Sequence, residues 1–242
     1  MSEKIQKVLA KQGLGSRREI EQWIRDGRVK VNGIVATLGA RITLSDPVLL
    51  DNRPVVFNKS TEDEVLLYHK PEGELCTRHD PEGRVDVFSA LPPPKQGRWV
   101  LIGRLDLNTS GLLLLTTNGE LAHRLMHPSY EIEREYAVRV LGTPSELQLV
   151  QLLDGVLIDG LKAKFVTIEA MHSVGTNTWY RVVIMEGRQR EVRRLWQAVG
   201  LTVSRLIRIR FGPISLPKTL DKGRLVYLSP QEIKQLKRVV GL

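Results

Sequence analysis

A loop motif ahead of an apolar strand is the feature that most constrains this chain of 242 residues. The motif reads Gly103-Arg104-Leu105-Asp106-Leu107-Asn108-Thr109-Ser110-Gly111, and four leucines, Leu112 to Leu115, follow it. An apolar run bounded by turn residues is typical of a buried strand. We predict that a small-polar turn, Thr109 to Gly111, holds the Asp106 carboxylate in front of this strand and leaves it open to a ligand.

The charge balance indicates a polyanionic partner. The chain has 36 Lys and Arg against 27 Asp and Glu, a formal net charge of +9, which favours nucleic acid first and an anionic membrane surface second. The single Cys76 excludes an internal disulfide and a multi-cysteine zinc site. Because the start has no apolar signal core and no run approaches a membrane span, we expect a cytoplasmic protein with no membrane partner.

The first sixty residues are predicted to form a compact basic unit. Ile5, Val8 and Leu9 have helical spacing, and Ser16-Arg17-Arg18-Glu19 is a capping box that begins a second helix. Asn32-Gly33 indicates a hairpin turn. The unit has 11 Lys and Arg against 6 Asp and Glu. A solvated helix surface is the alternative, but this imbalance favours contact with RNA phosphates, with these candidates: Arg17, Arg18, Arg28 and Lys30.

A polar linker around Asn58 to Glu64 precedes a second region of strands and short helices. The predicted strands are Leu112 to Thr117, Glu135 to Val140, Lys164 to Ala170, Trp179 to Met185 and Val203 to Arg210. The predicted helices are Glu120 to Met126, Ser145 to Leu153, Arg190 to Val199 and Pro230 to Val239. This order predicts an α+β fold with a mostly antiparallel mixed sheet and flanking helices.

Several kinds of chemistry lack their motifs. The chain has no Walker phosphate loop and no glycine-rich dinucleotide fingerprint. His123 and His127 could share a helix face, but a third ligand is missing, so we expect no metal site. Cys76 has no neighbouring nucleophile motif, which favours a plain reduced thiol. The remaining candidate is the Asp106 carboxylate in a basic setting, with no cofactor.

Two further segments accompany Asp106. Alternation places Tyr136, Val138 and Val140 on one strand face, where core packing is the simpler interpretation for the tyrosine. Seven arginines then occur within 23 residues, against Glu191 alone: Arg188, Arg190, Arg193, Arg194, Arg205, Arg208 and Arg210. Because nearly unopposed like charges repel one another, a bound polyanion explains them better than a solvated face does.

With these motifs in order, the chain resembles a ribosomal-RNA pseudouridine synthase of the family typified by small-subunit pseudouridine synthase A. The N-terminal unit resembles an S4 RNA-binding domain through Gly15-Ser16-Arg17-Arg18-Glu19 and the run Gly27 to Gly33. The rest resembles the catalytic domain through His69-Lys70-Pro71-Glu72-Gly73, the Gly103 to Gly111 run, Tyr136 and the run Gly187 to Arg194. The resemblance implies an S4-like domain at 1–60, a linker at 61–64 and a pseudouridine synthase catalytic domain at 65–242.

The resemblance also implies residue roles. Asp106 matches the essential catalytic aspartate, Arg104 the arginine that helps to extrude the target nucleotide, and Tyr136 the tyrosine that stacks on the flipped base. Arg193 matches the basic residue that pairs with the aspartate. Further RNA contacts are expected at Lys70, Arg188, Arg190 and Arg194.

The implied activity is isomerisation of a uridine to pseudouridine in a stem-loop of large-subunit (23S) ribosomal RNA, by a monomeric isomerase that needs no cofactor. Whether Asp106 attacks C1′ or abstracts a sugar proton stays open. A non-catalytic RNA-binding or ribosome-assembly factor on the same fold is the alternative, but the intact motifs favour the enzyme.

Overall fold

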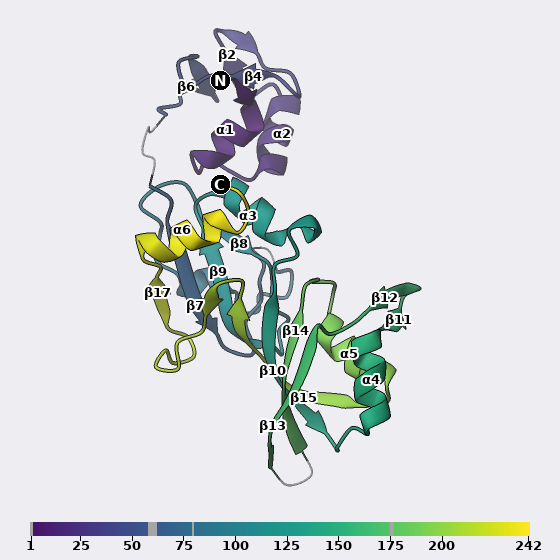
Figure 1. Cartoon of the computed structure of the whole chain (residues 1–242). Coiled ribbons are helices and arrows are strands. Elements are labelled where there is room, and N and C mark those ends of the chain that lie inside the picture. Colours follow the sequence, from purple (N-terminus) through teal and green to yellow (C-terminus); the bar gives the residue numbers. More distant parts are fainter. Residues whose placement is uncertain (1, 58–61, 79, 175–176) are drawn as a thin grey trace. The chain divides into compact units, whose positions relative to one another are not determined.

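The computed structural model describes residues 2–57, 62–78, 80–174 and 177–242. The chain divides into two compact units (Figure 1). The first comprises Met1–Glu64, Pro93–Val100 and Thr117–Gly119, and the second comprises Val65–Pro92, Leu101–Thr116 and Glu120–Leu242. Residues 58–61 of the predicted linker lie outside the described residues, so the linker stays a prediction.

The first unit packs two helices against a small sheet. Helices α1 (Ile5–Lys11) and α2 (Arg17–Arg25) contribute Ile5, Leu9 and Ile20, which have no exposed surface, to its core. Its strands are β1 (Glu3–Lys4), β2 (Val29–Val31), β3 (Ile34–Val35), β4 (Arg41–Ile42), β5 (Val48–Leu50) and β6 (Arg53–Pro54). β1 pairs with β4, and the other four form a sheet in the order β3-β2-β5-β6.

Two local predictions for this unit are confirmed. Ser16 Oγ accepts from the Glu19 N–H at 3.1 Å while Glu19 accepts from the Ser16 N–H, so the capping box begins α2. Asn32 and Gly33 connect β2 to β3 with φ of 51° and 83°. A turn with two left-handed residues matches the twist of the strands that it joins, so the hairpin follows from these two residue types.

The second unit contains a nine-stranded sheet in the order β13-β14-β10-β15-β9-β7-β17, with β16 on β15 and β8 on β9. Its strands are β7 (Val65–Lys70), β8 (Val100–Ile102), β9 (Ser110–Thr116), β10 (Arg134–Leu141), β13 (Thr167–Val174), β14 (Asn177–Ile184), β15 (Thr202–Phe211), β16 (Ile214–Ser215) and β17 (Leu225–Tyr227). β15 and β9 are parallel, whereas the flanking pairs β10–β15 and β7–β9 are antiparallel. The mostly antiparallel mixed sheet is therefore confirmed.

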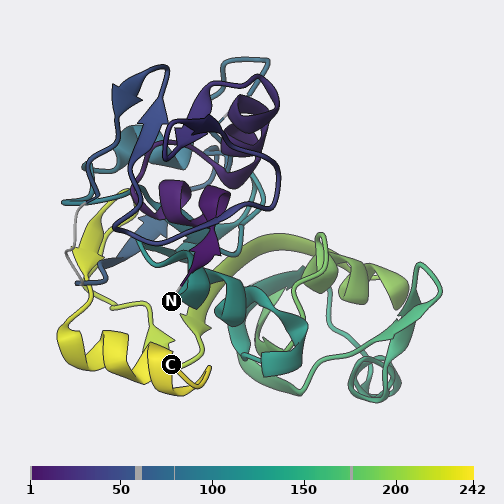
Figure 2. The same cartoon turned by 90° about the horizontal axis from the view of Figure 1, so that it is seen from above.

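The α-helices beside this sheet in the described part of the chain are α3 (Gly119–Met126), α4 (Glu146–Asp154), α5 (Glu191–Ala198) and α6 (Pro230–Arg238). Figures 1 and 2 show α4 and α5 beside β10, β14 and β15, and α6 near β17 at the other end of the unit. Trp196 of α5 is fully buried between the rings of Phe165 and Tyr180, with centroids 5.8 and 5.2 Å away. This aromatic cluster fixes α5 against the sheet.

One strand begins later than predicted. The sequence predicted a strand from Lys164, whereas β13 begins at Thr167. Leu161–Ala163 instead forms β12, which pairs with β11 (Val156–Ile158), and the Phe165 N–H donates to the carbonyl of Leu152 in α4 at 3.0 Å. The backbone from Leu161 to Phe165 therefore has other partners, and the first bond to β14 on this side comes from the Val166 N–H, which donates to the Val183 carbonyl at 2.8 Å. No helix in the described part of the chain is both long enough and apolar enough to cross a bilayer.

Candidate active site

The Asp106 loop lies between β8 and β9 in the second unit. The Thr109 N–H donates to the Asp106 carbonyl at 3.0 Å, which closes a turn from Asp106 to Thr109. Ser110 and Gly111 already belong to β9, so the prediction of a turn at Thr109 to Gly111 is wrong by about three residues. The four leucines that follow have no exposed surface. The turn therefore projects from a strand that the core holds in place, and Asp106 itself is half-buried.

Gly111 allows β9 to approach β15. It has a φ of 111°, and a Cβ at this position would lie 2.2 Å from the carbonyl oxygen of Arg208. Real Cβ atoms do not approach a carbonyl this closely, and only glycine adopts such a φ readily. The last glycine of the motif is therefore required by the parallel pairing of Gly111 with Arg208.

Lys70, the last residue of β7, binds the backbone of the Asp106 loop through its ammonium group. Its side chain has no exposed surface, and Nζ donates to the carbonyls of Pro71 at 2.8 Å, Asp106 at 3.2 Å and Thr109 at 2.9 Å. Burial lowers the pKa of Lys70, and the nearby Cys76 and carboxylates oppose this shift. The prediction that Lys70 contacts RNA is therefore wrong, because a buried ammonium bound to three carbonyls positions the loop instead.

The other two carbonyls of the turn also have donors. The Gly73 N–H donates to the Leu107 carbonyl at 2.8 Å, and Arg193 Nη2 donates to the Asn108 carbonyl at 2.7 Å. All four carbonyls from Asp106 to Thr109 are therefore bound. Because the backbone is held at every residue, the Asp106 carboxylate is presented in a preorganised position.

Arg193 reaches this loop from α5. Besides Asn108, its guanidinium donates to the Val203 carbonyl at 2.8 Å. Burial lowers the pKa of Arg193 and Arg190 adds to this, whereas Asp106 and Glu72 oppose it. The guanidinium thus interacts electrostatically with Asp106 but donates to the backbone of its loop, and the predicted pairing of the two side chains stays a prediction.

Tyr136 and Arg104 differ in exposure. Tyr136 lies on β10, is 7% exposed, and shares a face with the buried Val138 and Val140, as the alternation predicted. Arg104 is exposed two residues before Asp106. A buried ring at the side of the sheet and an exposed cation on the loop suit the roles that the resemblance implies, which stay predictions.

Arg134 and Glu191 are buried charged residues that the sequence did not identify as site residues. Arg134, 7% exposed, donates to the carbonyls of Ile132 at 2.7 Å and Met185 at 2.6 Å. Glu191, 4% exposed, accepts from the Arg188 N–H at 2.9 Å, and burial raises its pKa. Together they fix the ends of the loop that carries Arg188 and Arg190. The signal for Arg134 was present in the sequence, since it alternates in phase with Tyr136 and Val138.

The arginines of these segments have a larger number of acidic partners than predicted. Arg188 pairs with Glu186 at 2.7 Å, Arg194 with Asp159, and Arg210 with Glu133 and Glu135. These carboxylates come mostly from segments distant in sequence, so the expectation that Glu191 alone opposes the seven arginines is wrong.

The basic residues of the first unit lie on α2 and β2 and beside the turn between them. Arg17 and Arg18 are exposed in the first turn of α2. Arg28 forms a two-pronged ion pair with Asp51 at 2.6 and 2.8 Å, and Lys30 donates to Asn52 at 2.9 Å. Arg28 is thus paired, but it stays exposed.

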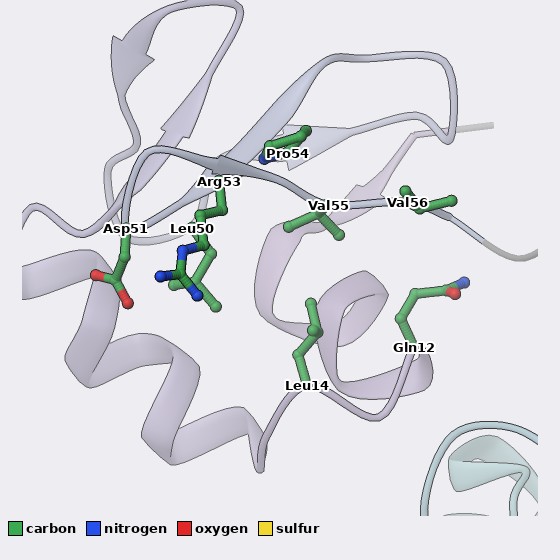
Figure 3. A pocket seen from close by; sticks show the side chains of 8 residues that line it. All are labelled: Gln12, Leu14, Leu50, Asp51, Arg53, Pro54, Val55 and Val56. Atoms are coloured by element: carbon green, nitrogen blue, oxygen red, sulfur yellow. The ribbon is translucent and has the colours of Figure 1, made fainter.

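A hollow of about 560 Å³ lies elsewhere on this unit (Figure 3), lined by Gln12, Leu14, Leu50, Asp51, Arg53, Pro54, Val55 and Val56. None of the predicted site residues lines it. In the second unit, no group of three or more His, Cys, Asp or Glu side chains among the described residues could hold a metal ion.

Comparisons with known proteins agree with this geometry. A family model described as RNA pseudouridylate synthase matches residues 64–198, and an S4 domain model matches residues 3–48. The match to the first model contains Asp106, Tyr136 and Arg193.

Curated relatives align over the whole chain. The chain is 53% identical to ribosomal large subunit pseudouridine synthase B of Pseudomonas aeruginosa, of which it spans 64%. It is 54% identical to the protein of the same name from Yersinia pestis and spans 77% of it. It is also similar to a solved structure, a crystal structure of pseudouridylate synthase, with a TM-score of 0.67 and 26% identity over 96% of this chain and 99% of that one.

Proposed function

Because the chain belongs to the RNA pseudouridylate synthase family, we propose that it isomerises a uridine of large-subunit ribosomal RNA to pseudouridine at Asp106. One observation carries this proposal: four bound carbonyls hold the Asp106 turn in front of β9. The names of the relatives support the large subunit as the source of the RNA.

The reaction fits a site built around one carboxylate. The N1–C1′ bond breaks, the uracil turns, C5 bonds to C1′, and the proton from C5 is released while N1 gains one. The product is an isomer of the substrate, so the reaction needs no oxidant or reductant, and only protons are exchanged with water. Asp106 acts either by attacking C1′ or by abstracting a sugar proton, and both routes need the carboxylate ionised and fixed beside the ribose.

The target base must leave its stack before the carboxylate can reach it. Unstacking and unpairing cost a few kcal/mol, least in a loop or bulge. We assign Tyr136 to stack on the flipped base and recover part of this cost. We assign Arg104, exposed on the same loop, to occupy the space that the nucleotide leaves. Arg193 keeps positive charge beside Asp106 and holds the Asn108 carbonyl.

We assign RNA contact to exposed or half-buried basic residues of both units: Arg17, Arg18, Arg28, Lys30, Arg188, Arg190 and Arg194. Phosphate contacts of this kind set affinity and its dependence on salt rather than the choice of base. The enzyme is proposed to act as a monomer in the cytoplasm, where ribosomal RNA is its polyanionic partner.

Tritium release from RNA labelled at C5 of uridine tests this proposal. Wild-type protein is expected to release tritium from large-subunit RNA fragments, and Asp106→Asn is expected to bind the RNA with wild-type affinity and release none. An Asp106→Asn protein that releases tritium at a near-normal rate would remove Asp106 from the reaction. A wild-type protein that binds RNA without release would favour the alternative of an RNA-binding or assembly factor.

A further inference from the structure

A row of four paired residues crosses the sheet beneath the Asp106 loop. Lys70 of β7 pairs with Gly111 of β9, Gly111 pairs with Arg208 of β15, and Arg208 pairs with Tyr136 of β10. Directly paired positions carry their side chains on the same face of a sheet. Arg208 therefore lies between the lysine that holds the Asp106 turn and the tyrosine assigned to the flipped base, next to a glycine with no side chain.

The Arg208 guanidinium bonds to the strand that follows the Asp106 loop and lies near the first residue of the motif. Nε donates to the Leu112 carbonyl at 2.7 Å, just beyond the loop. Nη1 lies 3.8 Å from the position that a Cβ on Gly103, the first residue of the motif, would occupy. The guanidinium also lies over the Phe211 ring, 5.4 Å from its centroid. Arg208 is therefore fixed beside the strand that carries the Asp106 loop.

Arg208 is only 2% exposed, and its Nη2 is buried with no hydrogen-bond partner among the described residues. A buried charge without a carboxylate partner is unfavourable, and an apolar side chain of similar volume is usually tolerated as well or better. Such a group in a native structure therefore calls for an explanation. Arg208 also lies beyond residues 64–198, which the family model matches.

We propose that Arg208 is a positioning residue for the isomerisation, whose fixed positive charge beneath the Asp106 loop stabilises the ionised carboxylate during the reaction. This inference rests on the proposed role of Asp106. Lys70 from β7 and Arg193 from α5 both interact electrostatically with Asp106 and with Glu72, and Arg104 lies two residues before Asp106 on the same loop. Arg208 adds positive charge from β15, where its guanidinium donates to the Leu112 carbonyl of β9.

Neutral and charged replacements separate this role from a structural one. Arg208→Gln keeps a donor for Leu112 without the charge, Arg208→Met removes both, and Arg208→Lys keeps the charge. Arg238→Gln on α6 is the matched control, since Arg238 is exposed and lies outside the site. Thermal melts establish that each variant is folded. Because Met replaces a buried unpaired charge, we expect Arg208→Met to fold even if Arg208→Gln does not.

Single-turnover tritium release at saturating RNA, measured against pH, is the first readout. Both neutral variants are expected to lose about tenfold in rate, less than the loss of a donor that touches the reacting atoms, with unchanged RNA affinity. Their activity is expected to fall off at a higher pH on the acid side than in the wild type, whereas Arg208→Lys keeps the wild-type profile. Equal losses in Arg208→Met and Arg208→Lys with unchanged profiles would show a purely structural role and overturn the inference.

Cys76 supplies a second readout that needs neither RNA nor catalysis. Its Sγ accepts from the Leu105 N–H of the same loop at 3.5 Å. Burial raises the pKa of Cys76, and Leu105, Lys70, Arg208 and Arg104 oppose this shift. The pH dependence of alkylation by iodoacetamide is expected to move to higher pH in Arg208→Met and not in Arg208→Lys.

The possible outcomes are distinguishable. An unchanged alkylation curve in Arg208→Met would refute the idea that the charge acts at the loop. An active Asp106→Asn protein would instead refute the proposed function, whatever the Arg208 variants show. If Asp106→Asn is inactive and the Arg208 variants match the control, this inference alone fails.

Discussion

Replacing Lys70 by methionine is expected to damage both the stability of the second unit and the rate of isomerisation, while RNA affinity stays the same. The side chain has no exposed surface, and its ammonium donates to the carbonyls of Pro71, Asp106 and Thr109. Methionine fills a similar volume and donates nothing.

The magnitude follows from the bonds that are lost. The Asp106 carbonyl keeps the Thr109 N–H as a donor, whereas the carbonyls of Pro71 and Thr109 lose the ammonium. A buried carbonyl left unpaired costs about 1–3 kcal/mol, and removing the buried charge of the lysine offsets part of that cost. We therefore expect the free energy of unfolding to fall by about 2–4 kcal/mol. A displacement of the turn of about 1 Å lowers the rate by roughly a hundredfold.

Urea unfolding and single-turnover tritium release measure the two effects, and Lys218→Met, at an exposed lysine, is the control. The pKa of Lys70 is lowered in the folded protein, so the folded state binds fewer protons than the unfolded one between the two pKa values. Wild-type stability relative to Lys70→Met should therefore increase as pH rises toward the unfolded value. If Lys70→Met had the wild-type rate and stability but bound RNA weakly, Lys70 would be an RNA contact and not a buried anchor of the Asp106 loop.

Two further predictions concern the basic segments. Glu191→Gln keeps an acceptor for the Arg188 N–H and removes a buried carboxylate whose pKa is raised. The free energy of unfolding of the wild type should therefore fall as pH rises through the folded pKa of Glu191. Urea unfolding should show Glu191→Gln more stable relative to the wild type at pH 7 than at pH 4. An equal stability difference at both pH values contradicts this prediction. Replacing Arg17 and Arg18 together by alanine should lower the slope of log affinity against log salt by about 0.7 to 0.9 per lost phosphate contact, and an unchanged slope would remove both residues from the RNA surface.

Local signals predicted the elements of this fold well. The capping box at Ser16 and the turn at Asn32-Gly33 act through neighbouring residues, so a short stretch of sequence is enough to place α2 and the hairpin. The four leucines likewise placed β9, although the strand begins at Ser110, inside the motif and two residues earlier than predicted. The late start of β13 was beyond such signals, because it depends on the pairing of Leu161–Ala163 with β11.

The chemistry of the site was less predictable than its location. The motif singled out Asp106, whereas alternation alone favoured core packing for Tyr136 and only the resemblance implied a role for it; both roles stay predictions. The burial of Lys70 depends on a turn 36 residues later in the chain. Basic residues are usually exposed, so Lys70 was assigned to RNA contact, and Arg210 was counted among arginines with almost no acidic partner. Their actual partners are carbonyls and carboxylates that only the folded sheet brings close.

The parallel pairing of β9 with β15 determines when the site can form. Ser110 pairs with Ile207 and Gly111 with Arg208, nearly one hundred residues further along the chain. Closing so long a loop costs entropy before any contact repays it, and pairings at large sequence separation form slowly. The motif around Asp106 is therefore translated long before its pairing partner β15 exists. We expect the Asp106 loop to reach its native conformation late in folding, when β15 pairs with β9.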